Sequence, residues 1–107
     1  MLEYILCKQT VTVYRREGGS VTRRVVEGCF YHHEARTDGE RFVRKFLLIC
    51  PGAVEIRPGD RVLEGVGPED VVWEEFLPVN VPGLGEAAYA APWYWDGHID
   101  HWEAGRK

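Results

Sequence analysis

Apolar residues alternate with polar ones near the start of the chain, with the period of a β-strand buried on one face. Residues 10–14 read Thr-Val-Thr-Val-Tyr, which is β-branched or aromatic throughout and apolar at every second position. Gly18-Gly19 can take positive φ, and the β-prone residues 21–33 follow. The pattern predicts a hairpin, and Gly28 inside its second strand indicates a bulge or bend that would curl the sheet toward a barrel.

Two further strands are predicted in the middle of the chain, each after a turn. Residues 38–39, Asp-Gly, form a strong turn signal, and residues 42–50 are nearly continuous in apolar and β-prone side chains. That run predicts the most buried strand. Residues 57–60, Arg-Pro-Gly-Asp, predict a turn because proline presets φ, and residues 61–64 then form a short strand.

The last third of the chain is less regular. A strand is expected at residues 71–81, where Pro78 would end it or place it at an edge. Residues 82–95 are rich in Gly, Ala and aromatic residues and are expected to form a loop, with at most one short helical turn. The chain is therefore predicted to be all-β, a small barrel or curled antiparallel sheet of about six short strands. Loops 34–41 and 82–95 are its candidate extensions.

Length and composition fit one domain over residues 1–107. With 45% hydrophobic and 12% aromatic residues, the chain has enough apolar surface to fold. The longest apolar run is far shorter than the roughly 20 residues of a membrane helix, and no basic segment precedes a hydrophobic N-terminal stretch, so neither membrane insertion nor export is expected. Cys7, Cys29 and Cys50 lack CxxC spacing and are expected to be buried thiols without a disulfide, in a reducing compartment.

Charge is distributed unevenly along the chain. Residues 1–50 hold nine Lys and Arg against six Asp and Glu, a net charge of +3, and residues 51–107 hold four against eleven, a net charge of −7. The pairs Arg15-Arg16 and Arg23-Arg24 flank the first predicted turn, which favours a solvated hairpin over a nucleic-acid interface. A second interpretation is a head-to-tail contact between the basic half of one copy and the acidic half of another, which could close a ring.

Four histidines form the only grouping that suggests a metal. His32-His33 and His98, His101 with Asp96 have side chains that bind zinc, iron or manganese. Adjacent strand residues point to opposite faces, and residues three apart do the same, so the spacing argues against one shared site. A metal-binding β-barrel protein or enzyme using His32, His33, His98 and His101 stays as the alternative function, and no metal, cofactor-binding or catalytic residue is assigned.

The sequence holds none of the GxSxG, HExxH, GxxxxGK[ST] or GxGxxG motifs, so hydrolase and nucleotide-binding functions have no support and no cofactor is expected. A Cys–His pair through Cys29 or Cys50 is formally open, although a thiol in an apolar strand stays protonated and inert. Residues 93–95 and Trp102 concentrate aromatic side chains near the C-terminus. They fit either core packing or a surface that binds a protein partner.

Four short segments follow one another along the chain and together touch most of it outside residues 71–94. They are Thr-Val-Thr-Val-Tyr at 10–14, Gly-Cys-Phe-Tyr-His at 28–32, Ile-Arg-Pro-Gly-Asp-Arg-Val at 56–62 and His-Trp-Glu-Ala-Gly-Arg-Lys at 101–107. In this order the chain resembles small phage and prophage proteins of Gram-positive hosts that are encoded in head–tail connector gene clusters. These proteins are often called minor capsid or head-completion proteins.

The resemblance implies a non-enzymatic β-barrel of the head-closure or stopper type. Such a protein assembles as a ring of six between the portal or adaptor side and the tail, and the isolated chain can be a monomer. DNA passes through the ring without specific binding. The expected locations are the cytoplasm of the bacterial host during assembly and then the neck of the virion. Because adaptor subunits are mostly helical and tail terminators mix helices with a sheet, the shortage of helix patterns favours the stopper.

Overall fold

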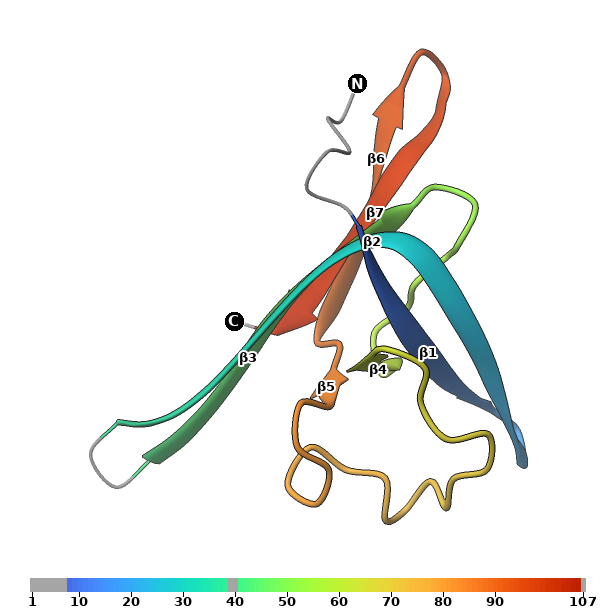
Figure 1. Ribbon diagram of the computed structural model, residues 1–107. Coiled ribbons are helices and arrows are strands. Elements are labelled where there is room, and N and C mark those ends of the chain that lie inside the picture. The colour runs from blue at the N-terminus through green and yellow to red at the C-terminus, as the bar shows by residue number, and fades with distance from the viewer. Residues whose placement is uncertain (1–7, 39–40, 107) are drawn as a thin grey trace.

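Seven strands form one antiparallel sheet in the part of the chain that the computed structural model describes, residues 8–38 and 41–106 (Figure 1). The sheet is curled into a half-barrel with the strand order β5-β4-β1-β2-β3-β7-β6. No helix occurs in these residues, so the all-β prediction is confirmed. The strands are β1 (Gln9–Glu17), β2 (Ser20–Asp38), β3 (Arg41–Pro51), β4 (Arg61–Glu64), β5 (Gly85–Glu86), β6 (Tyr89–Trp95) and β7 (His98–Arg106).

A bend in β2 lets this one strand serve both halves of the sheet. Its first part pairs with β1 and its second part pairs with β3, with the change between Cys29 and Phe30. Gly28 lies next to this change and has a φ of 74°, which glycine adopts without strain. Beside it, a bulge shifts the register of the pairing between β1 and β2. The predicted bend at Gly28 and the predicted hairpin turn at Gly18-Gly19 are both confirmed.

Gly28→Ala is expected to lower the free energy of unfolding by about 1–2 kcal/mol, because a Cβ is strained at positive φ. Urea denaturation followed by tryptophan fluorescence measures the change. Gly19→Ala is the matched control, since a Cβ there meets no atom within 4 Å and φ is not positive. Equal losses in the two variants would contradict a conformational role for Gly28.

The two edges of the sheet meet within one short segment. The edge strands are β5, which pairs with β4, and β6, which pairs with β7. Only residues 87 and 88 separate them in the chain. Between these strands, the Ala87 N–H donates to the Asp60 carbonyl and the Ala88 N–H donates to the Gly105 carbonyl, both at 2.8 Å. The loop or helical turn expected at residues 82–95 is therefore wrong for most of its length. Pairing with β4 and β7 overrides the weak strand propensity of its glycines and alanines.

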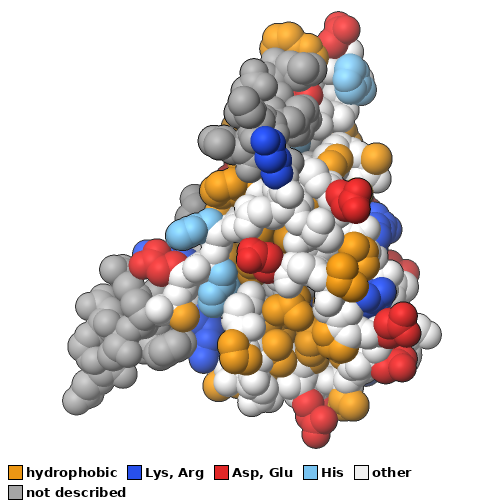
Figure 2. All heavy atoms as spheres, viewed as in Figure 1, with side chains coloured by type: hydrophobic (Ala, Val, Ile, Leu, Met, Phe, Trp, Pro, Cys, Tyr) orange, Lys and Arg blue, Asp and Glu red, His pale blue; other side chains and the backbone are white. Residues whose placement is uncertain are grey.

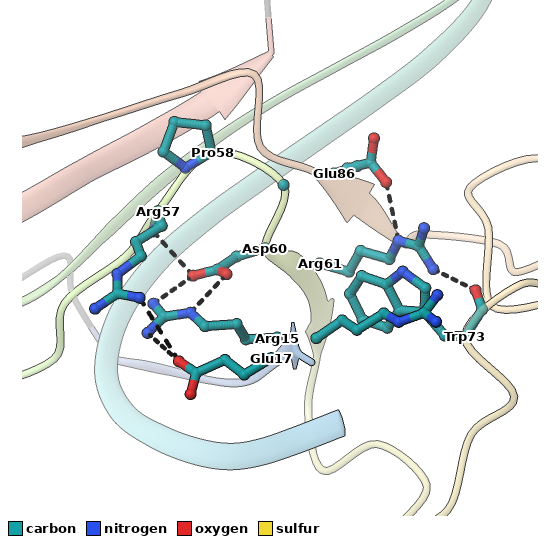
Figure 3. A pocket seen from close by; sticks show the side chains of 10 residues that line it. Arg15, Glu17, Arg57, Pro58, Asp60, Arg61, Trp73 and Glu86 are labelled. Atoms are coloured by element: carbon teal, nitrogen blue, oxygen red, sulfur yellow. Dashed lines mark hydrogen bonds and ion pairs between the residues drawn. The ribbon is translucent and has the colours of Figure 1, made fainter. Parts of the chain in front are cut away.

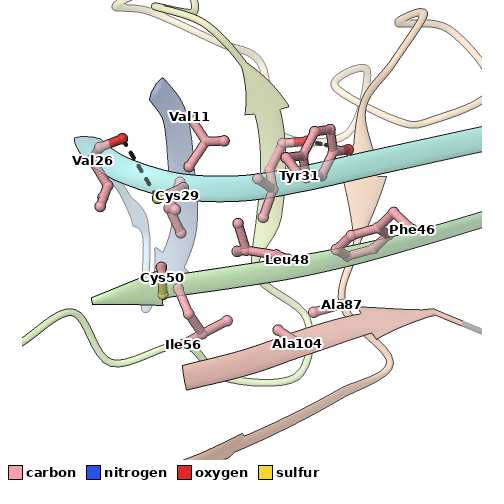
Figure 4. Close-up of a cluster of buried hydrophobic side chains, with 12 residues drawn as sticks. Val11, Val26, Cys29, Tyr31, Phe46, Leu48, Cys50, Ile56, Ala87 and Ala104 are labelled. Carbon is pink, nitrogen blue, oxygen red and sulfur yellow. Dashed lines mark hydrogen bonds between the residues drawn. The ribbon is translucent and has the colours of Figure 1, made fainter. Parts of the chain in front are cut away.

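The main hydrophobic core lies between the strands of the curled sheet (Figure 4). Gly85 approaches the Phe46 ring so closely that a side chain at position 85 would collide with it. The close approach explains why small residues stand where the sheet edges meet. The buried members of this core are Val11, Val13, Val26, Cys29, Tyr31, Phe46, Leu48, Cys50, Ile56, Val62, Ala87 and Ala104.

Residues 65–84 carry a second hydrophobic cluster, built on Tyr14, Phe76 and Leu84. The rings of Tyr14 and Phe76 meet edge to face at a centroid distance of 4.6 Å, and the Tyr14 hydroxyl donates to the Pro68 carbonyl at 2.7 Å. Residues 65–84 therefore cover β1 on the side away from the main core.

The strand expected at residues 71–81 does not form. The Phe76 N–H donates to the Val72 carbonyl at 2.9 Å, and the neighbouring backbone hydrogen bonds are equally local. The segment therefore folds into successive turns, and its apolar side chains cover β1 instead of pairing in the sheet.

The longest run of buried positions among the described residues lies in β1, whereas the strand at residues 42–50 was expected to be the most buried. Residues 11–14 are buried at four successive positions, because Val11 and Val13 enter the main core and Tyr14 enters the second cluster. In β3, burial alternates between partial and full over residues 45–50, as in a strand covered fully on one face only.

Two hairpins project from the half-barrel (Figure 1). In the β2–β3 hairpin, residues 34–38 and 41–45 pair only with each other among the residues described, since pairing with β7 begins at Phe46. The loop expected at residues 34–41 is thus mostly strand, with residues 39 and 40 outside the described part. The β6–β7 hairpin forms the second projection.

Candidate docking site

A tight turn at Asp96-Gly97 closes the β6–β7 hairpin. The two residues have φ values of 51° and 81°, as in the two-residue turns whose twist matches that of the flanking strands. Aromatic side chains stand on both sides of this turn, at the projecting end of the hairpin. We define the aromatic tip as Trp93, Tyr94, Trp95, His98 and His101.

Four side chains of the aromatic tip are exposed to solvent: His98, and three large aromatic side chains, Trp93 at 53%, Tyr94 at 68% and Trp95 at 55%. Trp102 differs, because it packs against the main core and its indole N–H donates to the Gly52 carbonyl at 3.3 Å. Core packing and a partner-binding surface, the two interpretations of the C-terminal aromatic residues, therefore apply to different side chains. Trp102 belongs to the packed interior, and the other three form a surface of the kind that marks interaction sites.

The two histidines of the tip share one face of the hairpin. Trp93 lies opposite His101 and Trp95 lies opposite His98, with a register shift between these pairs. Trp93 and Trp95 are two residues apart and therefore point to the same face, which their cross-strand partners share. The prediction that His98 and His101 face opposite ways is wrong, because the bulge adds one residue to β7.

One of these cross-strand pairs is held in a defined geometry. The rings of Trp93 and His101 are nearly parallel, at 6° with a centroid distance of 5.9 Å. Nδ1 of His101 lies 2.9 Å from Oδ2 of the neighbouring Asp100. The contact with Asp100 orients the imidazole and so keeps the face of Trp93 in place.

The surroundings of the tip are acidic. Residues 87–105 contain no Lys or Arg but include Asp96, Asp100 and Glu103. Figure 2 shows hydrophobic and acidic side chains together at the projecting end of the molecule. Of these acids, Asp96 at the turn is exposed, whereas the Asp100 side chain is 10% exposed and contacts His101. The tip therefore combines exposed aromatic faces with one exposed carboxylate, a combination that favours cations over phosphate groups.

The other two histidines lie elsewhere on the sheet. His32 is opposite Leu47, which in turn is opposite Gly105 of β7. Gly105 is four residues beyond His101, about 13 Å along a strand. The structure therefore does not unite the four histidines of the metal hypothesis, and no group of three or more His, Cys, Asp or Glu side chains in residues 8–38 and 41–106 is placed to hold a metal ion. Burial lowers the pKa of His33.

A cavity of about 360 Å³ lies beside β1, β4, β5 and the turn at residues 57–60 (Figure 3). The turn predicted from the Arg-Pro-Gly-Asp motif is confirmed, since the Asp60 N–H donates to the Arg57 carbonyl at 3.0 Å. Four guanidinium groups surround the cavity. We define the arginine pocket by Arg15, Arg16, Arg57, Asp60, Arg61 and Trp73.

Asp60 is the centre of the hydrogen bonds that shape this pocket. Its carboxylate is 2% exposed and accepts from Nε and Nη2 of Arg15 at 2.9 and 2.8 Å, and from the Arg57 N–H at 2.9 Å. The hydrogen bonds to Asp60 raise the pKa of Arg15, although burial opposes them. The pair therefore ties β1 to the turn at residues 57–60.

Arg61 forms the opposite wall of the pocket and is 6% exposed. Its Nε donates to Glu86 Oε2 at 2.9 Å, and its guanidinium carbon lies 3.7 Å from the centre of the Trp73 ring. Nη1 also donates to the carbonyls of Trp73 and Phe76. Arg61 therefore fastens residues 65–84 to β4 and β5.

Two arginines of the pocket stay open to solvent. The side chains of Arg16 and Arg57 are 46% and 54% exposed, and they pair with Glu74 at 3.1 Å and with Glu55 at 2.9 Å. Exposed ion pairs of this kind contribute about 0–1 kcal/mol. Arg57 also pairs with Glu17, at 3.6 Å, so every guanidinium group of the pocket has a carboxylate partner within the chain.

Cys29 and Cys50 are both buried thiols, as expected, whereas Cys7 lies outside the described residues. Burial raises the pKa of Cys50 to about 12. A thiol of this kind is a poor nucleophile at neutral pH, because the thiolate is the reactive form.

Alkylation of Cys50 by iodoacetamide at pH 8 is expected to be at least about 100-fold slower in the native protein than in the protein unfolded in urea. The reason is that both burial and the raised pKa suppress the reactive thiolate. Peptide mass spectrometry over a time course measures the two rates. Similar rates in both states would show that the thiol is accessible and would contradict its placement in the core.

These features define a class, the small all-β proteins with a half-barrel sheet, here with an exposed aromatic hairpin and an arginine-lined pocket. No family model, curated protein sequence or solved structure matches the chain. Among the residues described, no helix is long and apolar enough to cross a membrane.

Proposed function

We propose that this protein is a non-enzymatic assembly subunit of a phage neck, of the head-closure or stopper type. The observation that carries the proposal is the aromatic tip, in which three adjacent aromatic side chains are more than half exposed. Exposing them to water is unfavourable, and contact with another protein removes that exposure. The sequence resemblance to head–tail connector proteins supplies the kind of assembly.

The projecting hairpins support a role in docking. A two-stranded ribbon is only marginally stable in water, and residues 34–38 and 41–45 form such a ribbon beyond the sheet. Both hairpins extend away from the half-barrel (Figure 1). In a neck, these projections would reach neighbouring subunits or neighbouring rings.

The charge distribution supports passage of DNA without binding. Residues 51–107 carry a net charge of −7, and the acidic tip belongs to this half. Carboxylates repel phosphates, whereas Lys and Arg contacts would hold the DNA and slow it.

Deleting the gene from the phage or prophage that carries it is expected to leave DNA-filled heads without tails, seen by electron microscopy. A plasmid copy of the gene should restore tailed particles, and a Trp93→Ala, Trp95→Ala double variant should not. Val66→Ala is the matched control, since Val66 is 72% exposed and lies outside the tip. Tailed infectious particles at the wild-type titre after deletion would overturn the proposal.

A further inference from the structure

We propose that Cys29 and Cys50 form a disulfide under oxidising conditions, and that this bond fixes the bend of the sheet. The two side chains are 0% and 1% exposed, and both belong to the main hydrophobic core (Figure 4). The inference concerns a covalent modification of the fold itself. It goes beyond the proposed function and does not depend on it.

The two cysteines lie opposite each other on neighbouring strands. β2 and β3 are antiparallel, and Phe30 pairs with Ile49 at the inner end of their ladder. Continuing this register by one residue places Cys29 of β2 opposite Cys50 of β3. Because side chains alternate along a strand and both cysteines are buried in the same core, they point to the same inner face of the sheet.

The type of pairing brings the two Cα atoms within reach of a disulfide. The side-chain amide of Gln9 accepts from the Tyr31 N–H at 2.8 Å and donates to the Tyr31 carbonyl at 3.1 Å, so these backbone groups point away from β3. Tyr31 is therefore a non-hydrogen-bonded position of the ladder with β3, and so is Cys29, two residues earlier. Cα atoms in such pairs are about 4.5 Å apart, and disulfides join Cα atoms about 4.4–6.8 Å apart.

Each thiol can turn toward the other without losing a strong contact. Sγ of Cys29 lies 3.7 Å from the Val26 carbonyl oxygen, and Sγ of Cys50 lies 3.7 Å from that of Val54. An S–H group is a weak donor, so rotation about χ1 gives up little. Burial raises the pKa of Cys50 to about 12, and the Cys29 thiol adds to this rise, which agrees with their placement as neighbours.

Glutathione disulfide, a low-molecular-weight disulfide, is the oxidant. One cysteine thiolate attacks a sulfur of glutathione disulfide and releases one glutathione thiolate, and the second cysteine thiolate attacks the mixed disulfide and releases the other. Two protein thiols are oxidised, one glutathione disulfide is reduced, and both protons pass to the released glutathione. Because burial suppresses the thiolates, exchange is fastest while this part of the sheet opens or folds. The same burial then shields the bond from reductants.

A bond at this position acts on the bend of β2. Cys29 lies next to Gly28, where β2 passes from β1 to β3, and Cys50 pairs with Trp102 of β7. The bond therefore ties the half of the sheet that holds β1, β4 and β5 to the half that holds β3, β6 and β7. Both projecting hairpins extend from the second half, so the bond fixes their direction relative to the first.

Equilibration of the full chain in mixtures of reduced and oxidised glutathione tests the bond. One set of samples is native and the other is kept in urea, and peptide mass spectrometry after acid quenching and alkylation measures the ratio of the Cys29–Cys50 disulfide to the two thiols. Folding favours the bond by the same factor as the bond favours folding. For a closed loop of roughly 20 residues, the native ratio is therefore expected to be at least about 100-fold higher than the ratio in urea.

Cys7→Ala leaves only this pair of thiols and should keep the ratio, and oxidation should raise its midpoint of urea unfolding by about 1–2 M. The matched control combines Cys7→Ala with Cys50→Ala, or with Cys29→Ala as a second version. Circular dichroism checks its fold, and oxidant should leave its midpoint unchanged. A native ratio no higher than that in urea, or a bond from Cys7 in place of this one, overturns the inference. Either result leaves the gene-deletion test of the proposed function unaffected.

Discussion

Asp60→Ala is expected to lower the free energy of unfolding by about 3–5 kcal/mol, the usual cost of removing one partner from a buried ion pair. The carboxylate is 2% exposed and accepts three hydrogen bonds, two from Arg15 and one from the Arg57 N–H. Without this carboxylate, the Arg15 guanidinium loses its main counter-charge, and the Arg57 N–H in the turn at residues 57–60 loses its hydrogen-bond acceptor. Urea denaturation followed by tryptophan fluorescence measures the loss.

Two variants separate this buried role from the removal of a surface charge. Asp60→Asn keeps an acceptor for the Arg57 N–H but removes the charge opposite Arg15, so its loss should be smaller than that of Asp60→Ala. Asp70→Ala removes an exposed carboxylate and should change stability by about 0.5 kcal/mol or less. If Asp60→Ala costs less than about 1 kcal/mol, the carboxylate does not hold β1 to the turn.

The first hairpin could be predicted from the sequence because its signals are local. Alternation over residues 10–14, Gly18-Gly19 at the turn and Gly28 at the bend each act within a few positions. The segments at 71–81 and 82–95 were predicted wrongly for the opposite reason. Their conformations depend on distant partners, namely β1 for the covering turns and β4 and β7 for the closing strands.

The candidate site could be predicted only in part. The aromatic cluster was visible, but the bulge that brings His98 and His101 to one face is a property of pairing with β6, and a period of two cannot reveal it. The motif at residues 57–60 predicted a turn and nothing more. Its partner Arg15 lies 45 residues earlier in the chain, so the arginine pocket exists only after folding.

Arg61→Met is expected to lower the free energy of unfolding by roughly 3 kcal/mol and to loosen residues 65–84. The side chain donates to Glu86 and to the carbonyls of Trp73 and Phe76, and methionine offers no donor for any of them. Denaturation in urea gives the total loss, and hydrogen exchange read by mass spectrometry locates it. Exchange should accelerate in residues 65–84 more than in β2 and β3.

The matched control for Arg61→Met is a substitution of Arg106, which pairs with the same carboxylate, that of Glu86. Arg106 also pairs with Glu86, at 3.6 Å, but its side chain is 44% exposed, so Arg106→Met should cost less than about 1 kcal/mol. Equal losses in the two variants would mean that burial of Arg61 adds nothing.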